Sequence, residues 1–315
     1  MVGVFEHTSS PVVFHVLHDK TLTQINRQKF IRTAEKYSQA VDFIDITKYK
    51  ALISAKLEEM SGKYTIGTFF RMFIPDELPQ LDKVIYFDID LVISLDIKEL
   101  WDIDLEDKSI AGVHDESFVT LKPFPYSERG ALLKFTNCRL DAYINAGIVI
   151  MNLRKIRAQG SFVETSLKWF KRYGHLAFFP DQDALNSIFL DDIKYIDGKY
   201  NTHKLERNMV DCIFHACTRG LHPWDSFRGR THENFFWAAF RKSAWGEDMT
   251  LEEFIGTIGR VAAGANFVHL HTRQCVKHTI NVIMWWVKKL FLGEYVKILR
   301  VLFIEFCNRL TRGQS

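Results

Sequence analysis

Runs of apolar residues alternate along the chain with segments whose apolar residues recur at helical spacing. In the first third, β-branched and aromatic runs predict strands over 10–18, 41–46, 84–87 and 110–113. The residues of 23–38 instead show the spacing of a helix with one apolar face. Strands that alternate with helices are typical of an α/β layered fold with parallel strand pairing.

The same alternation continues through the next hundred residues. Further strands are predicted over 142–152, 193–196 and 211–215, and further helices over 65–74 (bounded by Pro75), 162–173 and 181–189. Residues 117–140 are polar, contain proline and lack either period, which predicts a long loop over a site. The glycine at 147 lies inside a predicted strand, where glycine often marks a close backbone or ligand approach.

Two carboxylates interrupt the most apolar of these strands. Asp88 and Asp90 directly follow the run over 84–87, which we expect to be buried on both faces. A hard divalent cation suits two such carboxylates at the end of a strand, but an ordinary turn is the alternative. A third ligand is needed, and His215, at the end of another predicted strand, is the best candidate unless that histidine is only structural.

Other polar residues allow two interpretations each. The carboxylates of 181–183 suit the start of a helix, where they would act as caps, but they also suit a site. Asn145 could hydrogen-bond a sugar hydroxyl or only a neighbouring loop. Arg71 could pair with a phosphate or with Asp76.

Composition excludes some classes of function. The 315 residues are 47% hydrophobic and 25% charged, which is ordinary for a globular protein. A net charge of +3 is too small to indicate a nucleic-acid partner. The five cysteines are scattered and odd in number, which favours a reducing compartment. No signal peptide and no apolar run long enough to span a membrane are recognised, so we expect a cytoplasmic protein.

The last third changes in character. Over 280–312, apolar and aromatic residues alternate with lysine and arginine, a pattern typical of helices that lie in a membrane interface. A pair of ordinary core-packing helices gives the same pattern. We therefore predict one domain over 1–250 and a helical region over 251–315, in which 280–312 either contacts the inner face of the plasma membrane or packs on the core.

Several short motifs occur in an order that resembles family 8 of the glycosyltransferases, which includes bacterial lipopolysaccharide galactosyl- and glucosyltransferases and glycogenin. The resemblance covers roughly residues 5–245, and the combination is specific although each part is weak. The matching pieces are Arg71 before Ile74-Pro75, the strand 84–90 with its Asp-x-Asp, Leu100-Trp101, the Asn-Ala-Gly segment 143–152, the Asp-Gln-Asp segment 180–186, 199–201, and the loop 215–224.

That resemblance implies a fold and an activity. The fold would be of the GT-A type, a Rossmann-like mixed, mostly parallel sheet flanked by helices, with a helical C-terminal extension. The activity would be retaining transfer of a hexose, glucose or galactose, from a UDP-sugar to a cell-surface glycan or lipid-linked acceptor. Mn²⁺, with Mg²⁺ as a second option, would be the cofactor.

The resemblance also implies roles for single residues. Asp88, Asp90 and His215 would hold the metal, and Asp181 and Gln182 would lie at the catalytic face of the sugar. The donor-binding residues would be Arg71, Asp88, Asp90, Asp115, Asn145, Ala146 and His222. None of these is an unambiguous nucleophile, and an amide such as Gln182 would be a poor one.

Two features depart from the family pattern. The family's first strand, which binds uracil and ribose, has no counterpart, and residues 3–8 resemble the end of the helix that follows it. In the loop after His215, which is one residue longer than usual, His222 replaces a lysine and would bind phosphate only when protonated. The alternative function is therefore a non-catalytic remnant of the family that acts as a binding or interaction module.

Overall fold

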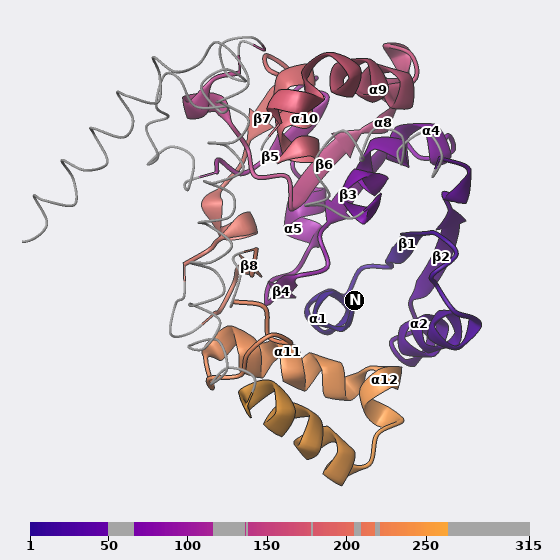
Figure 1. Ribbon diagram of the computed structural model, residues 1–315, viewed down its shortest axis with the longest axis vertical. Coiled ribbons are helices and arrows are strands. Elements are labelled where there is room, and N and C mark those ends of the chain that lie inside the picture. The colour runs from indigo at the N-terminus through magenta and orange to yellow at the C-terminus, as the bar shows by residue number, and fades with distance from the viewer. Residues whose placement is uncertain are drawn as a thin grey trace, which may run out of the picture. The chain divides into compact units, whose positions relative to one another are not determined.

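The computed structural model describes residues 1–49, 66–115, 136, 138–177, 179–204, 209–217 and 221–263 (Figure 1). The chain divides into two compact units, Met1–Thr257 and Ile258–Ser315. Most of the second unit, with the predicted membrane-contact segment 280–312, lies outside the described residues. The division predicted at residue 250 stays a prediction, and so does the loop over 117–140, most of which is also outside the description.

Helices and strands alternate through the first unit, as the pattern of apolar positions predicts. In chain order they are α1 (Val2–His7), β1 (Val13–His18), α2 (Gln24–Lys36), β2 (Ala40–Asp45), η1 (Thr47–Tyr49), η2 (Ile66–Phe73), α4 (Ile74–Glu77), β3 (Lys83–Phe87), β4 (Leu91–Ile93), α5 (Lys98–Trp101), β5 (Ile110–Gly112), η3 (Leu140–Ala142), β6 (Ile148–Asn152), α8 (Leu153–Ala158), α9 (Phe162–Tyr173), η4 (Gly174–Leu176), α10 (Pro180–Ile188), β7 (Ile193–Tyr195), η5 (Gly198–Asn201), β8 (Ile213–His215), α11 (Thr231–Lys242) and α12 (Ala244–Glu247). A further helix covers 251–263.

The largest sheet has the strand order β3-β6-β5-β7 and forms the centre of the unit (Figure 1). Its strand β6 runs antiparallel to both β3 and β5, whereas β7 runs parallel to β5. The mixed α/β fold is confirmed, but the expected predominance of parallel pairs is wrong for the described strands. Because alternation of side chains does not encode strand direction, the pattern could not show that β6 enters between β3 and β5 in reverse.

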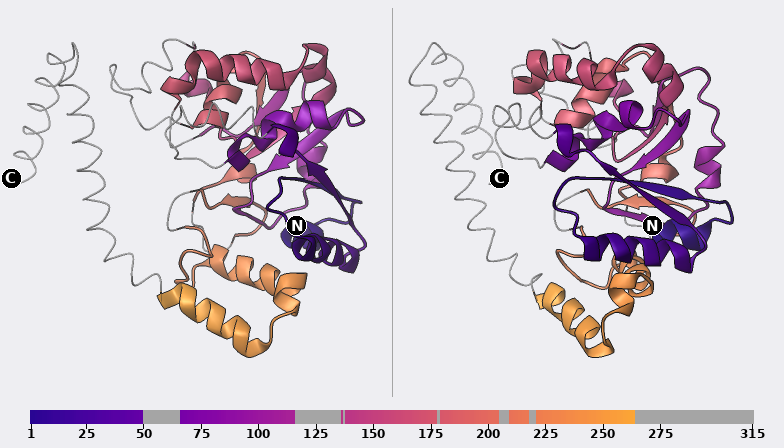
Figure 2. Two further views of the ribbon diagram at one scale, coloured as in Figure 1. Left: turned by 45° about the vertical axis from the view of Figure 1, so that its right-hand side comes forward. Right: turned by 90° about the vertical axis from the view of Figure 1, so that its right-hand side faces the viewer.

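The first two strands form a separate parallel pair. Val13 of β1 lies opposite Ala40 of β2, and the register continues to His18 and Asp45. Among the described strands, none pairs with the other edge of β1 or with the outer edge of β3. Figures 1 and 2 show β1 and β2 apart from the central sheet, with α2 beside them.

Contacts with later parts of the chain hold α1 and α2 in place. Val4 and Phe5 of α1 are buried in one apolar cluster with Ile93 of β4, so the predicted helical segment at 3–8 is present as α1. The Ala244 amide of α12 donates to Thr33 Oγ1 of α2 over 3.0 Å. Both views of Figure 2 show α2 beside the C-terminal helices of this unit.

Three local predictions are wrong. The segment predicted as one helix to residue 74 is the 3₁₀ helix η2 followed by α4, whose first turn contains Pro75. Proline fits there because the first helical amides have no intrahelical partner. The strand predicted over 142–152 is restricted to β6, and β3 is half-buried rather than buried on both faces.

Across the described residues, we find no helix that combines the length and the apolar character needed to cross a membrane.

Candidate metal and donor site

Strand pairing brings Asp88, Asp90 and His215 to one place. Asp88 follows β3, and its amide donates to the Gly147 carbonyl over 2.8 Å. Asp90 precedes β4, which runs antiparallel to β8 and places Leu91 opposite His215. The Ala216 amide donates to the Asp90 carbonyl over 2.9 Å, which fixes the end of β8 against the loop between β3 and β4.

The side chains of this trio converge. His215 Nε2 lies 3.2 Å from Asp90 Oδ1 and 3.8 Å from Asp88 Oδ2, and one ligand atom from each residue lies within 4.8 Å of the others. Burial raises the pKa of Asp90, but His215, a backbone hydrogen bond and His222 together lower it by more, so the carboxylate form is favoured. Two carboxylate oxygens and one imidazole nitrogen suit a divalent cation such as Mn²⁺ or Mg²⁺.

A chain of hydrogen bonds decides which nitrogen of His215 carries a proton. The Gly147 amide can only donate, so the Asn145 atom that it meets over 2.9 Å is the carbonyl oxygen. That oxygen also accepts from Asn201 Nδ2 over 2.9 Å, which turns Asn201 Oδ1 toward His215 Nδ1 at 3.0 Å. His215 Nδ1 must therefore donate, and Nε2 is left to face Asp90.

The donor set consequently fits a cation. A neutral His215 would point the Nε2 lone pair at Asp90, and two acceptors 3.2 Å apart repel unless a positive centre lies between them. A proton on Nε2 or a metal ion can fill that role. An amide that hydrogen-bonds the other ring nitrogen of a histidine ligand, and so fixes its tautomer, is a common support of metal sites.

Gly147 leaves room for the His215 ring. A Cβ atom at this position would lie 2.1 Å from His215 Cε1 and 2.5 Å from its Nδ1. Any larger residue would displace the ring. The sequence predicts a close approach at this glycine, and the group that approaches the backbone is the His215 side chain.

Arg71 joins the metal trio to the start of α10. Its guanidinium is buried and lies 2.7 Å from Asp88 Oδ1 and 2.9 Å from Asp181 Oδ2, and it donates to the Ala146 carbonyl. Burial lowers the pKa of Arg71, but the charges of Asp181 and Asp88 raise it by more. Burial also raises the pKa of Asp181, with Arg71 as the largest opposing influence. Arg71 thus pairs with carboxylates of the site rather than with Asp76.

Gln182 and Asp115 form a second buried cluster beside this one. Gln182 Oε1 accepts from the Ala146 amide over 2.9 Å, and its Nε2 donates to Asp115 Oδ2 over 3.0 Å. Asn145 Nδ2 also donates to Asp115 Oδ2, over 3.3 Å. A carboxylate held by two amides is a rigid acceptor of the kind that orients sugar hydroxyls.

The remaining polar residues at the start of α10 have structural roles. Asp183 accepts from the Tyr143 hydroxyl and from the Phe179 amide. Asn186 accepts from the Ile144 amide over 2.7 Å and donates to the Ile144 carbonyl over 2.8 Å. These bonds attach α10 to the segment before β6, which positions Asp181 and Gln182.

His222 reaches the same site from the other side. Its Nε2 lies 3.6 Å from Asp90 Oδ2, its Nδ1 lies 2.8 Å from Asp225 Oδ2, and its ring stacks on Trp224. A protonated His222 would add positive charge beside Asp90.

One large cavity contains all the residues that the sequence singled out. Its volume is 1790 Å³, above the range of about 300–1,000 Å³ that is usual for small-ligand pockets. It runs from the metal trio to the space between β1 and β3. The predicted residues that line it are Arg71, Asp88, Asp90, Asp115, Asn145, Ala146, Asp181, Gln182, His215 and His222.

Sequence reasoning missed two residues that support the trio. Tyr86 donates from its hydroxyl to Asp88 Oδ1 over 2.6 Å, and the Arg71 guanidinium lies over its ring at 4.3 Å. Asn201 fixes the tautomer of His215, as described above. The sequence indicates Tyr86 only as part of a strand and Asn201 only as part of a matching motif. The position of a polar side chain in the chain does not reveal its hydrogen-bond partners.

Comparisons with known proteins identify the family. A model of "Glycosyl transferase family 8" matches residues 1–217. A lipopolysaccharide 1,3-galactosyltransferase of Salmonella typhimurium is 26% identical over 288 residues, which cover 85% of this chain and 80% of that protein. A putative glycosyltransferase of Haemophilus influenzae is 25% identical over 208 residues, which cover 66% of this chain but only 59% of the relative's length.

The fold is also found among solved structures. The galactosyltransferase LgtC, in complex with donor and acceptor sugar analogs, superposes with a TM-score of 0.63 at 21% identity, over 81% of this chain and 92% of LgtC. The bifunctional glycosyltransferase WbbM gives a TM-score of 0.62 at 19% identity, over 83% of this chain and 48% of WbbM. The family match, which covers more than half of the chain, and the shared GT-A fold lead to one conclusion: this protein belongs to family 8 of the glycosyl transferases.

Proposed function

We propose that this protein is a metal-dependent retaining glycosyltransferase that moves a hexose, glucose or galactose, from a UDP-sugar to a cell-surface glycan or lipid-linked acceptor. The observation that carries the proposal is the convergence of Asp88, Asp90 and His215 in a cavity large enough for a nucleotide sugar. The similarity to a lipopolysaccharide galactosyltransferase supports the class of substrate. The location would be cytoplasmic, with acceptors reached at the inner face of the membrane.

Asp88, Asp90 and His215 would hold Mn²⁺ or Mg²⁺ against the diphosphate of the donor. Such an ion, when bound, supplies positive charge that stabilises the departing nucleotide. The protein's own contribution is geometric. Asn201 orients His215, Tyr86 and the Gly147 carbonyl hold Asp88, and the Ala216 amide holds the backbone of Asp90.

The sugar would lie over the cluster of Asp115, Asn145, Ala146 and Gln182. Asp115 accepts from both amides, so its carboxylate is oriented and can accept from a hydroxyl of the hexose. Asp181 is paired with Arg71 behind this cluster and would hold negative charge near the sugar. Because Gln182 uses both ends of its amide within the protein, we assign it to positioning the sugar rather than to attack.

The proposal is tested by release of UDP from UDP-galactose and UDP-glucose in the presence of Mn²⁺. We expect release with at least one donor, its loss on chelation of the metal, and its recovery when Mn²⁺ is returned. Equal rates with and without chelator would contradict a metal-dependent transferase.

The edges of β1 and β3, which pair with no further described strand, favour a second candidate function. Both strands line the cavity. If the part that they line gives the uracil and ribose no surface, the chain acts as a non-catalytic binding module. Calorimetric titration of UDP with Mn²⁺ separates the two functions, because absence of binding at millimolar UDP supports the module and binding supports the transferase.

A further inference from the structure

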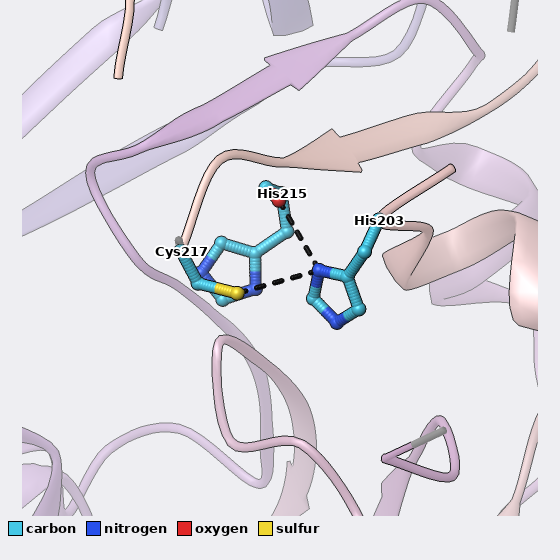
Figure 3. A group of neighbouring side chains, drawn as sticks. All are labelled: His203, His215 and Cys217. Atoms are coloured by element: carbon cyan, nitrogen blue, oxygen red, sulfur yellow. Dashed lines mark hydrogen bonds between the residues drawn. The ribbon is translucent and has the colours of Figure 1, made fainter. Parts of the chain in front are cut away.

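A second group of metal-binding side chains shares His215 with the site described above. His203, His215 and Cys217 each offer one ligand atom, and these atoms lie within 4.8 Å of one another (Figure 3). Cys217 Sγ lies 3.4 Å from His203 Nδ1, and the His203 and His215 rings are 5.4 Å apart between centroids. Figure 3 shows the three side chains turned toward one another at the end of β8.

Backbone pairing explains why they meet. Thr202 lies beside β8 in a parallel bridge with Phe214. The Thr202 amide donates to the Ile213 carbonyl, and the His215 amide donates to the Thr202 carbonyl, each over 2.9 Å. His203 therefore follows a residue that is fixed against β8, and Cys217 follows the end of the same strand.

The chemistry of this group differs from that of the Asp88 and Asp90 pair. A thiolate with two imidazoles is a set that zinc, cobalt and cadmium prefer, whereas manganese and magnesium prefer oxygen. Zinc bonds of about 2.0–2.1 Å to nitrogen and 2.3 Å to sulfur place tetrahedral neighbours about 3.5 Å apart. The distance from Cys217 Sγ to His203 Nδ1 matches that spacing. His203 Nδ1 also donates to the His215 carbonyl over 3.2 Å, so it must release that proton and that hydrogen bond to bind an ion.

An ion can reach the group from solvent, because Cys217 is exposed and His203 is half-buried. His215, in contrast, is buried, and both of its ring nitrogens are engaged, Nδ1 with Asn201 and Nε2 facing Asp90. An ion bound at Cys217 can take His215 only by breaking one of these two contacts. Either loss disturbs the ligand set of Asp88 and Asp90.

We propose that His203, His215 and Cys217 form a second, inhibitory site for zinc and other thiol-preferring divalent cations, which competes with Asp88 and Asp90 for His215. Binding at this site does not depend on the proposed function, and only the inhibitory consequence rests on it. Occupation of the site would turn off the transferase while Mn²⁺ is still present.

Cobalt provides the direct test, since a Co²⁺–thiolate bond absorbs light in a region where cobalt bound to oxygen and nitrogen does not. We titrate the reduced full-length chain with CoCl₂ and compare Cys217→Ser with the matched control Cys212→Ser, which lies on β8's other flank and outside the group. We expect a charge-transfer band in the wild type and in the control. Cys217→Ser should lack this band, and Zn²⁺ should abolish it. A band that survives in Cys217→Ser, or no band in the wild type, overturns the proposal.

A second variant keeps the test valid if the serine variant does not fold. His203→Gln retains the thiol but removes one imidazole, and we expect it to weaken Co²⁺ binding by at least about 10-fold. Unchanged Co²⁺ affinity in His203→Gln would also overturn the site.

Inhibition is measured separately. Zn²⁺ should suppress Mn²⁺-dependent UDP release by the wild type, and Cys217→Ser should need about 10-fold more Zn²⁺ for the same effect. Identical zinc sensitivity in the two proteins overturns the competition. A wild type that binds cobalt through its thiol but releases no UDP refutes the proposed function and leaves this metal site established.

Discussion

The metal corner and the β1 side line the same cavity, and they differ in how their groups are partnered. In the metal corner, formed by Asp88, Asp90, His215 and the amides around them, buried side chains are joined by hydrogen bonds and ion pairs. On the β1 side, formed by β1 and the facing edge of β3, strand residues are mostly half-buried and the facing strand edges lack a described partner.

The difference determines how much each region tolerates substitution. Buried polar groups are costly unless they are hydrogen-bonded, so any arrangement of the metal corner that breaks its hydrogen bonds is strongly disfavoured. Half-buried apolar strands tolerate change, because less transfer free energy depends on each side chain. We therefore expect substitutions in the metal corner to reduce activity strongly. Substitutions on the β1 side should change the free energy of unfolding only weakly.

Removal of a carboxylate from the trio should have the largest effect. Asp88→Ala and Asp90→Ala each delete a ligand, and we expect UDP release to fall by about 1,000-fold or more, because a metal contributes several kcal/mol of charge stabilisation. Asp102→Ala, at an exposed aspartate paired with Lys98, is the control. Activity that is equal in all three variants would remove the metal trio from the account.

A methyl group at Gly147 should be nearly as damaging. Its Cβ would meet the His215 ring at 2.1 Å, so the ring must move away from Asp90. We expect Gly147→Ala to bind Mn²⁺ at least about 100-fold more weakly. Its free energy of unfolding should fall by about 1–3 kcal/mol, because the added methyl group overpacks the site. Gly198→Ala is the matched control, because a Cβ there meets no atom within 4 Å. Normal Mn²⁺ affinity in Gly147→Ala would show that the position of the ring does not matter.

Loss of the Asn201 amide tests whether its hydrogen bond to His215 supports metal binding. Asn201→Ala leaves all three ligands in place but removes the acceptor for His215 Nδ1. We expect Mn²⁺ affinity to fall by about 10- to 100-fold, whereas Asn234→Ala on α11 should leave it unchanged. If both alanine variants bind Mn²⁺ like the wild type, the tautomer of His215 is set by something other than Asn201.

The smallest effect is expected on the β1 side, where one chemical change can be compared at two sites. Val149 of β6 is fully buried, and Val149→Ala should cost about 1.5–3 kcal/mol of unfolding free energy. Val13 of β1 is 54% exposed, and Val13→Ala should change that free energy by less than about 0.5 kcal/mol. Equal costs in urea unfolding would mean that β1 is packed as tightly as the central strand β6.

The sequence predicted the elements of the fold better than their arrangement. The helix over 162–173 follows from the spacing of its apolar residues, because burial of one helical face requires that spacing, and β3 follows from its unbroken apolar run. Strand direction and the separation of β1–β2 from the central sheet depend on contacts between distant segments, which no local period encodes.

For the site, motif order identified the residues, but their partners came only from the structure. The sequence allows Asp76 as a partner of Arg71, but Arg71 pairs with Asp88 and Asp181; its contact with a donor phosphate stays a prediction. Asn201 lies 14 residues from His215 in the chain and touches it only because η5 packs beside β8. A supporting residue of this kind has no signature in a single sequence.

The central claim is that Asp88, Asp90 and His215 hold a divalent cation against a nucleoside diphosphate. Electron paramagnetic resonance of free Mn²⁺ tests it directly, in titrations of the wild type and of Asp90→Asn with and without UDP. The account predicts that the wild type removes the free Mn²⁺ signal, that UDP strengthens this binding, and that Asp90→Asn loses both effects. Binding that is independent of UDP and of Asp90 would contradict it.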